Sequence, residues 1–97
     1  MAYRLSGQAE EDIINLYVHG ALQFGTHQAD RYHIGLHRTF ETIAANPHVS
    51  HERPEFEPQV RIHPFGSHVI IYQVIDKDDV LILRIRHGRE DWANAPT

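Results

Sequence analysis

The sequence contains no cysteine, so neither disulfide bonds nor thiolate metal ligands are available to this protein. Its apolar runs are short, like VIIY at 69–72, whereas a bilayer-spanning helix needs about 20 apolar residues. The first residues, MAYRLSGQAEEDI, lack the apolar region of a signal peptide. These absences lead us to expect a cytoplasmic protein.

The composition is that of a globular protein, with 41% hydrophobic and 23% charged residues. A chain of 97 residues predicts one domain, residues 1–97. The net charge of −4 argues against general affinity for nucleic acids, which depends on many cationic phosphate contacts. Eight of the nine cations are arginine, which suits bidentate contacts with carboxylate or phosphate groups.

Two amphipathic helices are predicted in the first half of the chain. Ser6 is a candidate N-cap, and apolar residues recur at helical spacing from there to Gly25. Thr26 is a candidate cap for a second helix, which Asn46-Pro47 ends. Because at most two residues join them, the helices should form an antiparallel hairpin, with Gly20 allowing close approach.

The second half of the chain predicts strands. Residues 46–58 contain three prolines and read as a loop, and residues 2–5 form a short candidate strand. From residue 60 apolar and polar residues alternate, and the segments 64–67 and 76–79 are typical of turns. The predicted fold class is α+β, with the N-terminal helical hairpin packed on one face of a three- to four-stranded antiparallel sheet.

The alternation also predicts which strand residues face the helices. Since arginine is rarely buried unpaired, the residues alternating with it should form the core. These are Val60, Ile62, Leu81, Leu83 and Ile85. The remaining residues, including Val80 and Ile82, should lie on the helix-free face.

This helix-free face is predicted to be a basic patch. No acid occurs from residue 80 to 89, so the arginines there should lack an internal counter-charge. We predict a partner-binding surface, and the alternative is an ordinary solvated sheet face. Trp92 has a further alternative, which is to fold back over the small core. The predicted partner-binding residues are Arg61, His63, Arg84, Arg86, His87, Arg89 and Trp92.

Metal and catalytic sites are not predicted. His33 and His37 have the i, i+4 spacing of a ligand pair, but no pattern supplies a third ligand, and we assign no metal and no cofactor. No serine lies in a nucleophile elbow. Glu90 and Asp91 are better explained as partners of Arg86 or Arg89 than as general bases. We assign no catalytic residue.

Several segments, in their order and spacing, resemble the ParE-type toxins of the RelE/ParE toxin–antitoxin superfamily, the plasmid stabilisation proteins. The resemblance covers residues 3–92, with Gly7 standing where proline often follows the serine cap. The segments are YRLSGQAEEDIINLY, FGTHQADRYHIGLHRTF, ETIAANP, VRIHPFGSHVIIYQV and ILRIRHGREDW.

The resemblance implies a helical hairpin on an antiparallel sheet, in agreement with the patterns above. It also implies the toxin of a type II toxin–antitoxin pair, which binds and poisons DNA gyrase. A ParD-like antitoxin would neutralise it by laying a C-terminal segment along the toxin, and would carry the DNA-binding end of the complex. We therefore expect a hetero-oligomer and a non-catalytic inhibitor.

RelE-like members of the same superfamily instead cleave mRNA on the ribosome, and this is the alternative function. General acid–base cleavage would require side chains positioned around the phosphodiester. Arg61, His63, Arg84 and His87 are the candidates here. No tyrosine follows Tyr72, and the acidic net charge suits ribosome binding poorly.

Overall fold

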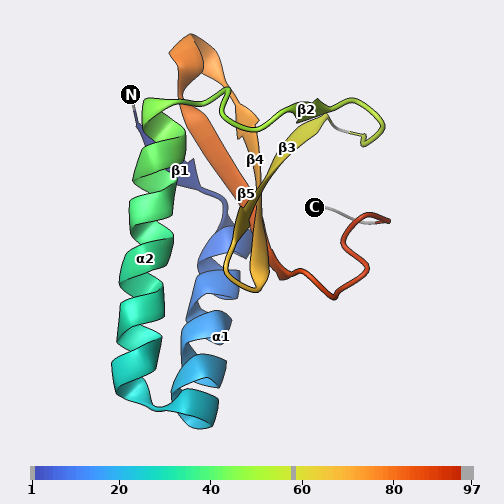
Figure 1. Ribbon diagram of the computed structural model, residues 1–97. Coiled ribbons are helices and arrows are strands. Elements are labelled where there is room, and N and C mark those ends of the chain that lie inside the picture. Colours follow the sequence, from blue (N-terminus) through green and yellow to red (C-terminus); the bar gives the residue numbers. More distant parts are fainter. Residues whose placement is uncertain (1, 58, 95–97) are drawn as a thin grey trace.

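The computed structural model describes residues 2–57 and 59–94. Two long helices form a hairpin on one side of a sheet, and the C-terminal segment lies on the other side (Figure 1). The elements are β1 (Tyr3–Leu5), α1 (Gly7–Phe24), α2 (Thr26–Ala45), β2 (Glu52–Arg53), β3 (Val60–Phe65), β4 (His68–Val74), a 3₁₀ turn (Asp76–Asp78) and β5 (Val80–His87).

The predicted helices are confirmed, with one correction at their junction. Ser6 caps α1, its hydroxyl accepting a hydrogen bond from the Ala9 amide at 3.0 Å. Thr26 does not cap α2, because Gly25 occupies the cap position with φ 91° and no side chain caps the helix. The two helices approach at Gly20, but a Cβ there would lie an ordinary 3.7 Å from the Ala29 Cβ, so the approach does not require glycine, contrary to the prediction.

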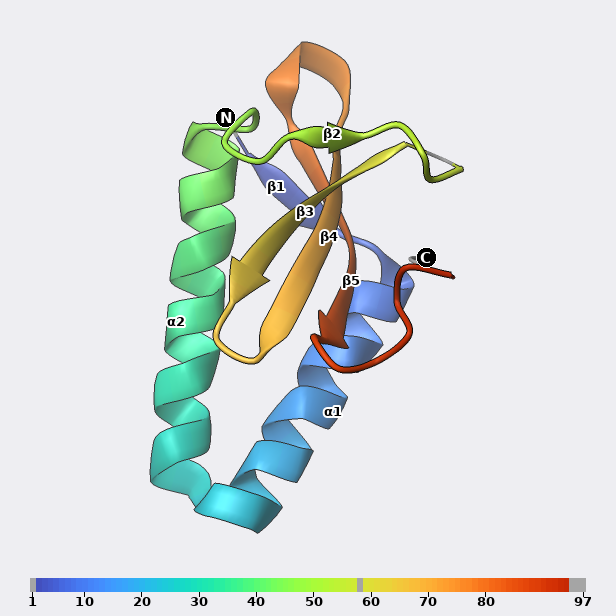
Figure 2. The ribbon, with the colours of Figure 1, turned by 45° about the vertical axis from the view of Figure 1, so that its right-hand side comes forward.

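The α+β prediction is confirmed, but the sheet has five strands and is mixed. The strand order is β1-β5-β4-β3-β2 (Figure 2). The neighbouring strands from β2 to β5 pair antiparallel to one another, whereas β1 runs parallel to β5. This parallel pair joins the first and last strands of the chain, which are separated by the helical hairpin and by β2, β3 and β4, and local alternation does not predict it. The predicted loop at 46–58 also contains the short edge strand β2.

A β-bulge in β5 reverses part of the predicted core. Ile71 pairs with Arg84 and Tyr72 pairs with Ile82, so Leu83 is an extra residue in β5. Ile82 is therefore on the same face as Ile85, although strict alternation would separate them.

The main core lies between the helices and the sheet. Val80 and Ile82 are fully buried there, so the prediction that they face away from the helices is wrong. Ile85 is in this core as predicted. Leu81 and Leu83 are only partly buried, and Leu83 packs on the opposite face.

A second, smaller core covers the helix-free face of the sheet. It contains Phe56, Val60 and Ile71, with Ile62 and Trp92 packed against it. The prediction that Val60 and Ile62 face the helices is therefore wrong. The physical reason is that this sheet buries apolar side chains on both faces, so that alternation alone does not say which face meets the helices.

Candidate functional site

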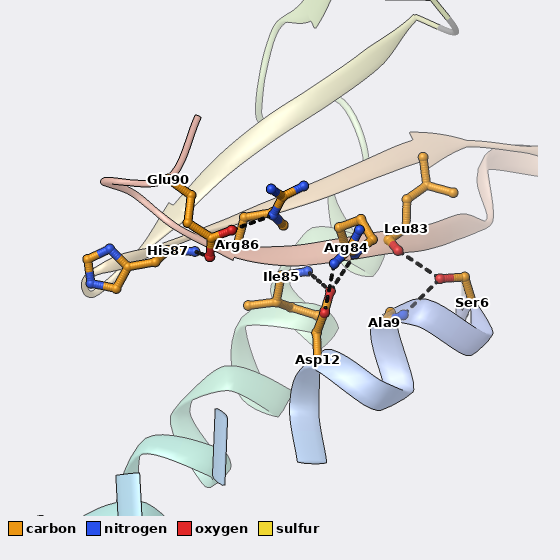
Figure 3. Close-up of polar contacts among 9 residues, drawn as sticks. All are labelled: Ser6, Ala9, Asp12, Leu83, Arg84, Ile85, Arg86, His87 and Glu90. Carbon is orange, nitrogen blue, oxygen red and sulfur yellow. Dashed lines mark hydrogen bonds and ion pairs between the residues drawn. The ribbon is translucent and has the colours of Figure 1, made fainter. Parts of the chain in front are cut away.

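The bidentate ion pair between Arg84 and Asp12 ties the middle of β5 to the first turns of α1 (Figure 3). The Nε and Nη2 atoms of Arg84 donate to the two Asp12 carboxylate oxygens at 2.7 and 3.0 Å. The same carboxylate accepts a hydrogen bond from the Ile85 amide at 3.0 Å. The side-chain hydrogen bonding between Arg84 and Asp12 raises the pKa of Arg84.

The position of Asp12 follows from the short parallel strand beside β5. The β1 strand pairs only with Val80–Ile82, so the following part of β5 is an edge. Ser6 donates to the Leu83 carbonyl at 2.7 Å, and Asp12 accepts from the next free amide (Figure 3). Side chains at the start of α1 therefore hydrogen-bond to the backbone carbonyl and amide groups of β5 that β1 does not reach.

Arg86 also has an acidic neighbour. Its Nε donates to Glu90 at 2.9 Å, while the His87 amide donates to the other Glu90 oxygen at 2.9 Å (Figure 3). Hydrogen bonds from His87 and then from Arg86 lower the pKa of Glu90. The prediction that the arginines of β5 lack an internal counter-charge is therefore wrong. The two compensating acids lie outside residues 80–89: Asp12 is distant in sequence, and Glu90 contacts Arg86 through the turn after β5.

The seven predicted partner-binding residues do not form one patch. Arg61 pairs across the sheet with Tyr72 of the main core, which places Arg61 and then His63 on the helix side. Arg61 donates to the Ser50 carbonyl at 2.6 Å, and His63 Nδ1 lies 2.9 Å from the Ser50 hydroxyl. Both side chains thus hold the loop after α2 against the sheet.

The other predicted residues lie near the end of β5 and in the segment after it. Arg89 is exposed, and no ion pair involves it among the described residues. Trp92 folds back, as its alternative predicted, and its ring lies 6.2 Å from that of Phe56 in an edge-on contact. The Trp92 indole is therefore partly buried on the second core. Arg89 remains the exposed cation of the segment after β5.

A cleft of about 660 Å³ separates the helical hairpin from the ends of β4 and β5. Arg84, Arg86 and His87 line one wall, and Asn15, His19 and Gln23 of α1 line another. The walls therefore carry hydrogen-bond donors and acceptors as well as two arginines that already have acidic partners.

Aromatic and imidazole rings fix the turn between β3 and β4 at this cleft. The Tyr32 hydroxyl lies 2.7 Å from His68 Nδ1 and donates to the Phe65 carbonyl at 3.2 Å. The His68 and His87 rings are 5.2 Å apart. Burial, and then the neighbouring His87, lower the pKa of His68, which favours the neutral imidazole.

The outer side of α1 carries an exposed apolar series that the sequence analysis did not identify. Ile14, Val18 and Leu22 are 62%, 48% and 81% exposed. Their i, i+4, i+8 spacing is the available signal, since it is a second stripe beside the one that forms the core. Phe24 is also exposed at the end of the helix. Exposed aliphatic groups in one row are typical of interaction surfaces.

The predicted histidine pair is close in space. The rings of His33 and His37 are 4.5 Å apart on α2, and His37 Nδ1 lies 3.2 Å from the Tyr3 hydroxyl. Within residues 2–57 and 59–94, no group of three or more possible ligands surrounds a metal position. In the same part of the chain, no helix has the length and hydrophobicity needed to cross a membrane.

This arrangement is a small α+β fold in which a helical hairpin packs on a mixed sheet whose last strand is tied to the first helix. The family profile of the ParE toxin of type II toxin–antitoxin systems of the parDE kind matches residues 3–92. The chain belongs to this ParE toxin family.

Known proteins agree with this assignment. The chain is 32% identical over 85 residues to Toxin ParE1 of Caulobacter vibrioides, covering 88% of this chain and 86% of that protein. A solved structure of the chromosomal ParDE system from P. aeruginosa has a similar fold, with a TM-score of 0.74 at 18% identity. That match covers 90% of this chain and 95% of the solved one.

Proposed function

We propose that this ParE-family chain inhibits DNA gyrase in the cytoplasm and that a ParD-like antitoxin neutralises it. The family assignment and the ParE1 relative support the toxin role. The solved relative comes from a ParDE system, which supports an antitoxin of the ParD kind as the partner. The gyrase target is the one that the resemblance to ParE toxins implies.

The separation of the candidate nuclease residues favours this proposal over mRNA cleavage. General acid–base cleavage needs its groups within hydrogen-bond reach of one phosphodiester. Arg61 and His63 lie in β3 and hold the loop at Ser50, whereas His87 ends β5 beyond the intervening β4. Arg84 is engaged by Asp12. The four residues therefore do not surround one position.

The target contact is proposed on the segment after β5, where Arg89 offers an exposed guanidinium. The backbone of this segment is held by hydrogen bonds among His87, Arg89 and Glu90. Arginine is enriched where interfaces concentrate their binding energy. Because the Arg89 side chain supports no described contact within the protein, its replacement should change binding without changing folding.

A supercoiling assay with purified gyrase tests the proposed target. Toxin should inhibit supercoiling or trap cleaved DNA, and added antitoxin should reverse the effect. Arg89→Glu should weaken inhibition by about tenfold or more. Arg31→Glu on the exposed side of α2 is the matched control and should inhibit like the wild type.

Growth arrest without any effect on gyrase would contradict the target. In that case, cleavage of mRNA on purified ribosomes would identify the alternative function. Inhibition of gyrase that is unchanged in Arg89→Glu would leave the target in place and would contradict only the contact site.

A further inference from the structure

We propose that His33 and His37 on α2 form a chelating site for one divalent transition-metal ion of the nickel, copper or zinc class. The two residues are four positions apart on a regular helix, so their side chains leave the same face of α2. Their rings are 4.5 Å apart, and both residues are partly exposed. The site involves none of the residues proposed to contact gyrase and does not depend on the proposed function.

The spacing of the two rings suits the binding of one ion. Imidazole nitrogens bind zinc at about 2.0–2.1 Å, and two rings bound at that distance have their centroids about 4.5 Å apart when the two bonds meet at a right angle. A right angle is typical of the square-planar and octahedral geometries that copper and nickel adopt. The observed separation is 4.5 Å. Rotation of the rings is therefore enough to aim both Nε2 atoms at one point, without movement of the helix.

Tyr3 of β1 holds the His37 ring in a state that can bind a metal. Its hydroxyl oxygen lies 3.2 Å from Nδ1 of His37. When Nδ1 carries the proton and donates to this oxygen, the lone pair of Nε2 is left for an ion. Histidines that bind metals almost always have such a partner on their second nitrogen. Tyr3 also packs on Phe40, with the ring centroids 5.4 Å apart, which fixes the position of its hydroxyl group.

Acidic side chains lie on both sides of the histidine pair along α2. Asp30 precedes His33 by three positions and accepts a hydrogen bond from Tyr17, whose ring lies 5.9 Å from that of His33. Glu41 follows His37 by four positions, and its charge acts on His37. These two carboxylates favour a bound cation electrostatically. In the described part of the chain no cluster of three ligands forms, so water fills the remaining coordination positions of the ion.

A second pair of imidazoles, His68 and His87, differs in the nitrogen that is available. Their rings are 5.2 Å apart, which would also allow both to reach one ion. Nδ1 of His87, however, accepts a hydrogen bond from the Arg89 amide at 3.0 Å, so the proton of the neutral ring is on Nε2. That nitrogen cannot bind a metal while this hydrogen bond is kept. The proposed site is therefore the pair on α2, and the second pair provides the control.

The test is a calorimetric titration of the untagged full-length protein with NiCl₂. We expect one site per chain. His33→Gln and His37→Gln should each lower the affinity for nickel by at least about 30-fold. Tyr3→Phe keeps the aromatic ring but removes the hydroxyl group, and should lower the affinity by about tenfold. The matched control His87→Gln should bind nickel like the wild type.

Two further measurements separate the site from an effect on folding. Nickel should raise the melting temperature of the wild type but not that of His37→Gln, because a ligand that binds only the folded state stabilises it. Circular dichroism shows whether each variant keeps its fold. In the wild-type protein, a substoichiometric amount of paramagnetic Ni²⁺ should broaden the NMR signals of His33 and His37 before those of His68 and His87. This measurement needs no variant.

Nickel affinity that is unchanged in both His33→Gln and His37→Gln would overturn the site. The inference is also wrong if His87→Gln lowers the affinity as much as His37→Gln does, because nickel would then bind scattered histidines of the surface. If the histidine variants fail to fold, the NMR titration of the wild type decides, and signals that broaden first away from α2 would contradict the proposal.

Discussion

At the scale of single residues, Asp12 changes how the basic end of β5 must be interpreted. It gives Arg84 a bidentate partner and also accepts the Ile85 amide. The two charged side chains are only 21% and 15% exposed, so each charge depends on the other for compensation. The basic character of β5 in the sequence is therefore largely neutralised in the folded protein.

Replacing Asp12 tests this role directly. Asp12→Asn keeps an acceptor for the Ile85 amide but leaves the Arg84 guanidinium without its counter-charge. We expect a loss of about 1–3 kcal/mol in the free energy of unfolding, measured by urea denaturation. The control is Glu55→Gln, which removes the exposed ion pair with Arg53 and should cost clearly less than Asp12→Asn, because water screens that pair. Equal effects of the two variants would contradict a special role for Asp12.

Gly66 makes a second prediction at this scale. It has φ 55° in the turn after β3, and a Cβ there would lie 2.5 Å from the Tyr32 hydroxyl oxygen. Gly66→Ala should destabilise the protein by about 2 kcal/mol or more, because the positive φ and the displaced Tyr32 both cost free energy. Gly7→Ala, where a Cβ meets nothing within 4 Å, is the control and should not lower the melting temperature.

At the scale of elements, β5 is joined to α1 through Ser6. Its hydroxyl accepts from the Ala9 amide as the helix cap and donates to the Leu83 carbonyl at the bulge. One side chain thus satisfies the start of a helix and the irregular point of a strand. The cap is predictable from local sequence, whereas the bond to Leu83 joins residues 77 positions apart and is not.

Two substitutions separate these roles of Ser6. Ser6→Ala removes both hydrogen bonds and should lower the free energy of unfolding by about 1–3 kcal/mol. Ser6→Asp keeps a cap acceptor but has no proton to donate to Leu83, so its loss should be smaller but measurable. Equal losses for the two variants in urea denaturation would show that the cap contributes nothing.

At the scale of the whole molecule, burial of histidines couples stability to pH. Burial lowers the pKa values of His37, His63 and His68, so the unfolded chain binds protons more readily at these sites than the folded protein. Stability should therefore be full above about pH 6.5 and fall as the pH drops through the lowered pKa values. Glu90, whose pKa is also lowered, affects stability only at more acidic pH.

The expected result is a lower urea midpoint at pH 5.5 than at pH 7.5. His68→Gln keeps a polar group near Tyr32 and should reduce this difference, because one of the three sites no longer titrates. His27→Gln at the exposed start of α2 is the control and should leave the difference unchanged. A midpoint that does not depend on pH between these values would contradict the coupling.

The sequence by itself determined the helical hairpin, the three central strands and the family resemblance. Helical and strand periods, the Ser6 cap and the Asn46-Pro47 stop are local signals, and they act on a few neighbouring residues. It also identified Trp92 and the arginines of β5 as residues of interest and predicted Glu90 as a possible partner of Arg86, which is confirmed. It did not predict the pairing of Arg84 with Asp12.

Only the tertiary structure decided which faces are buried and which charges are compensated. The bulge at Leu83 shifts the alternation of β5, and the second core turns Val60 and Ile62 away from the helices. Asp12 meets Arg84 across 72 positions of the chain. These features depend on how segments distant in sequence pack together, and no local pattern carries that information. The same packing leaves Ile14, Val18 and Leu22 of α1 exposed.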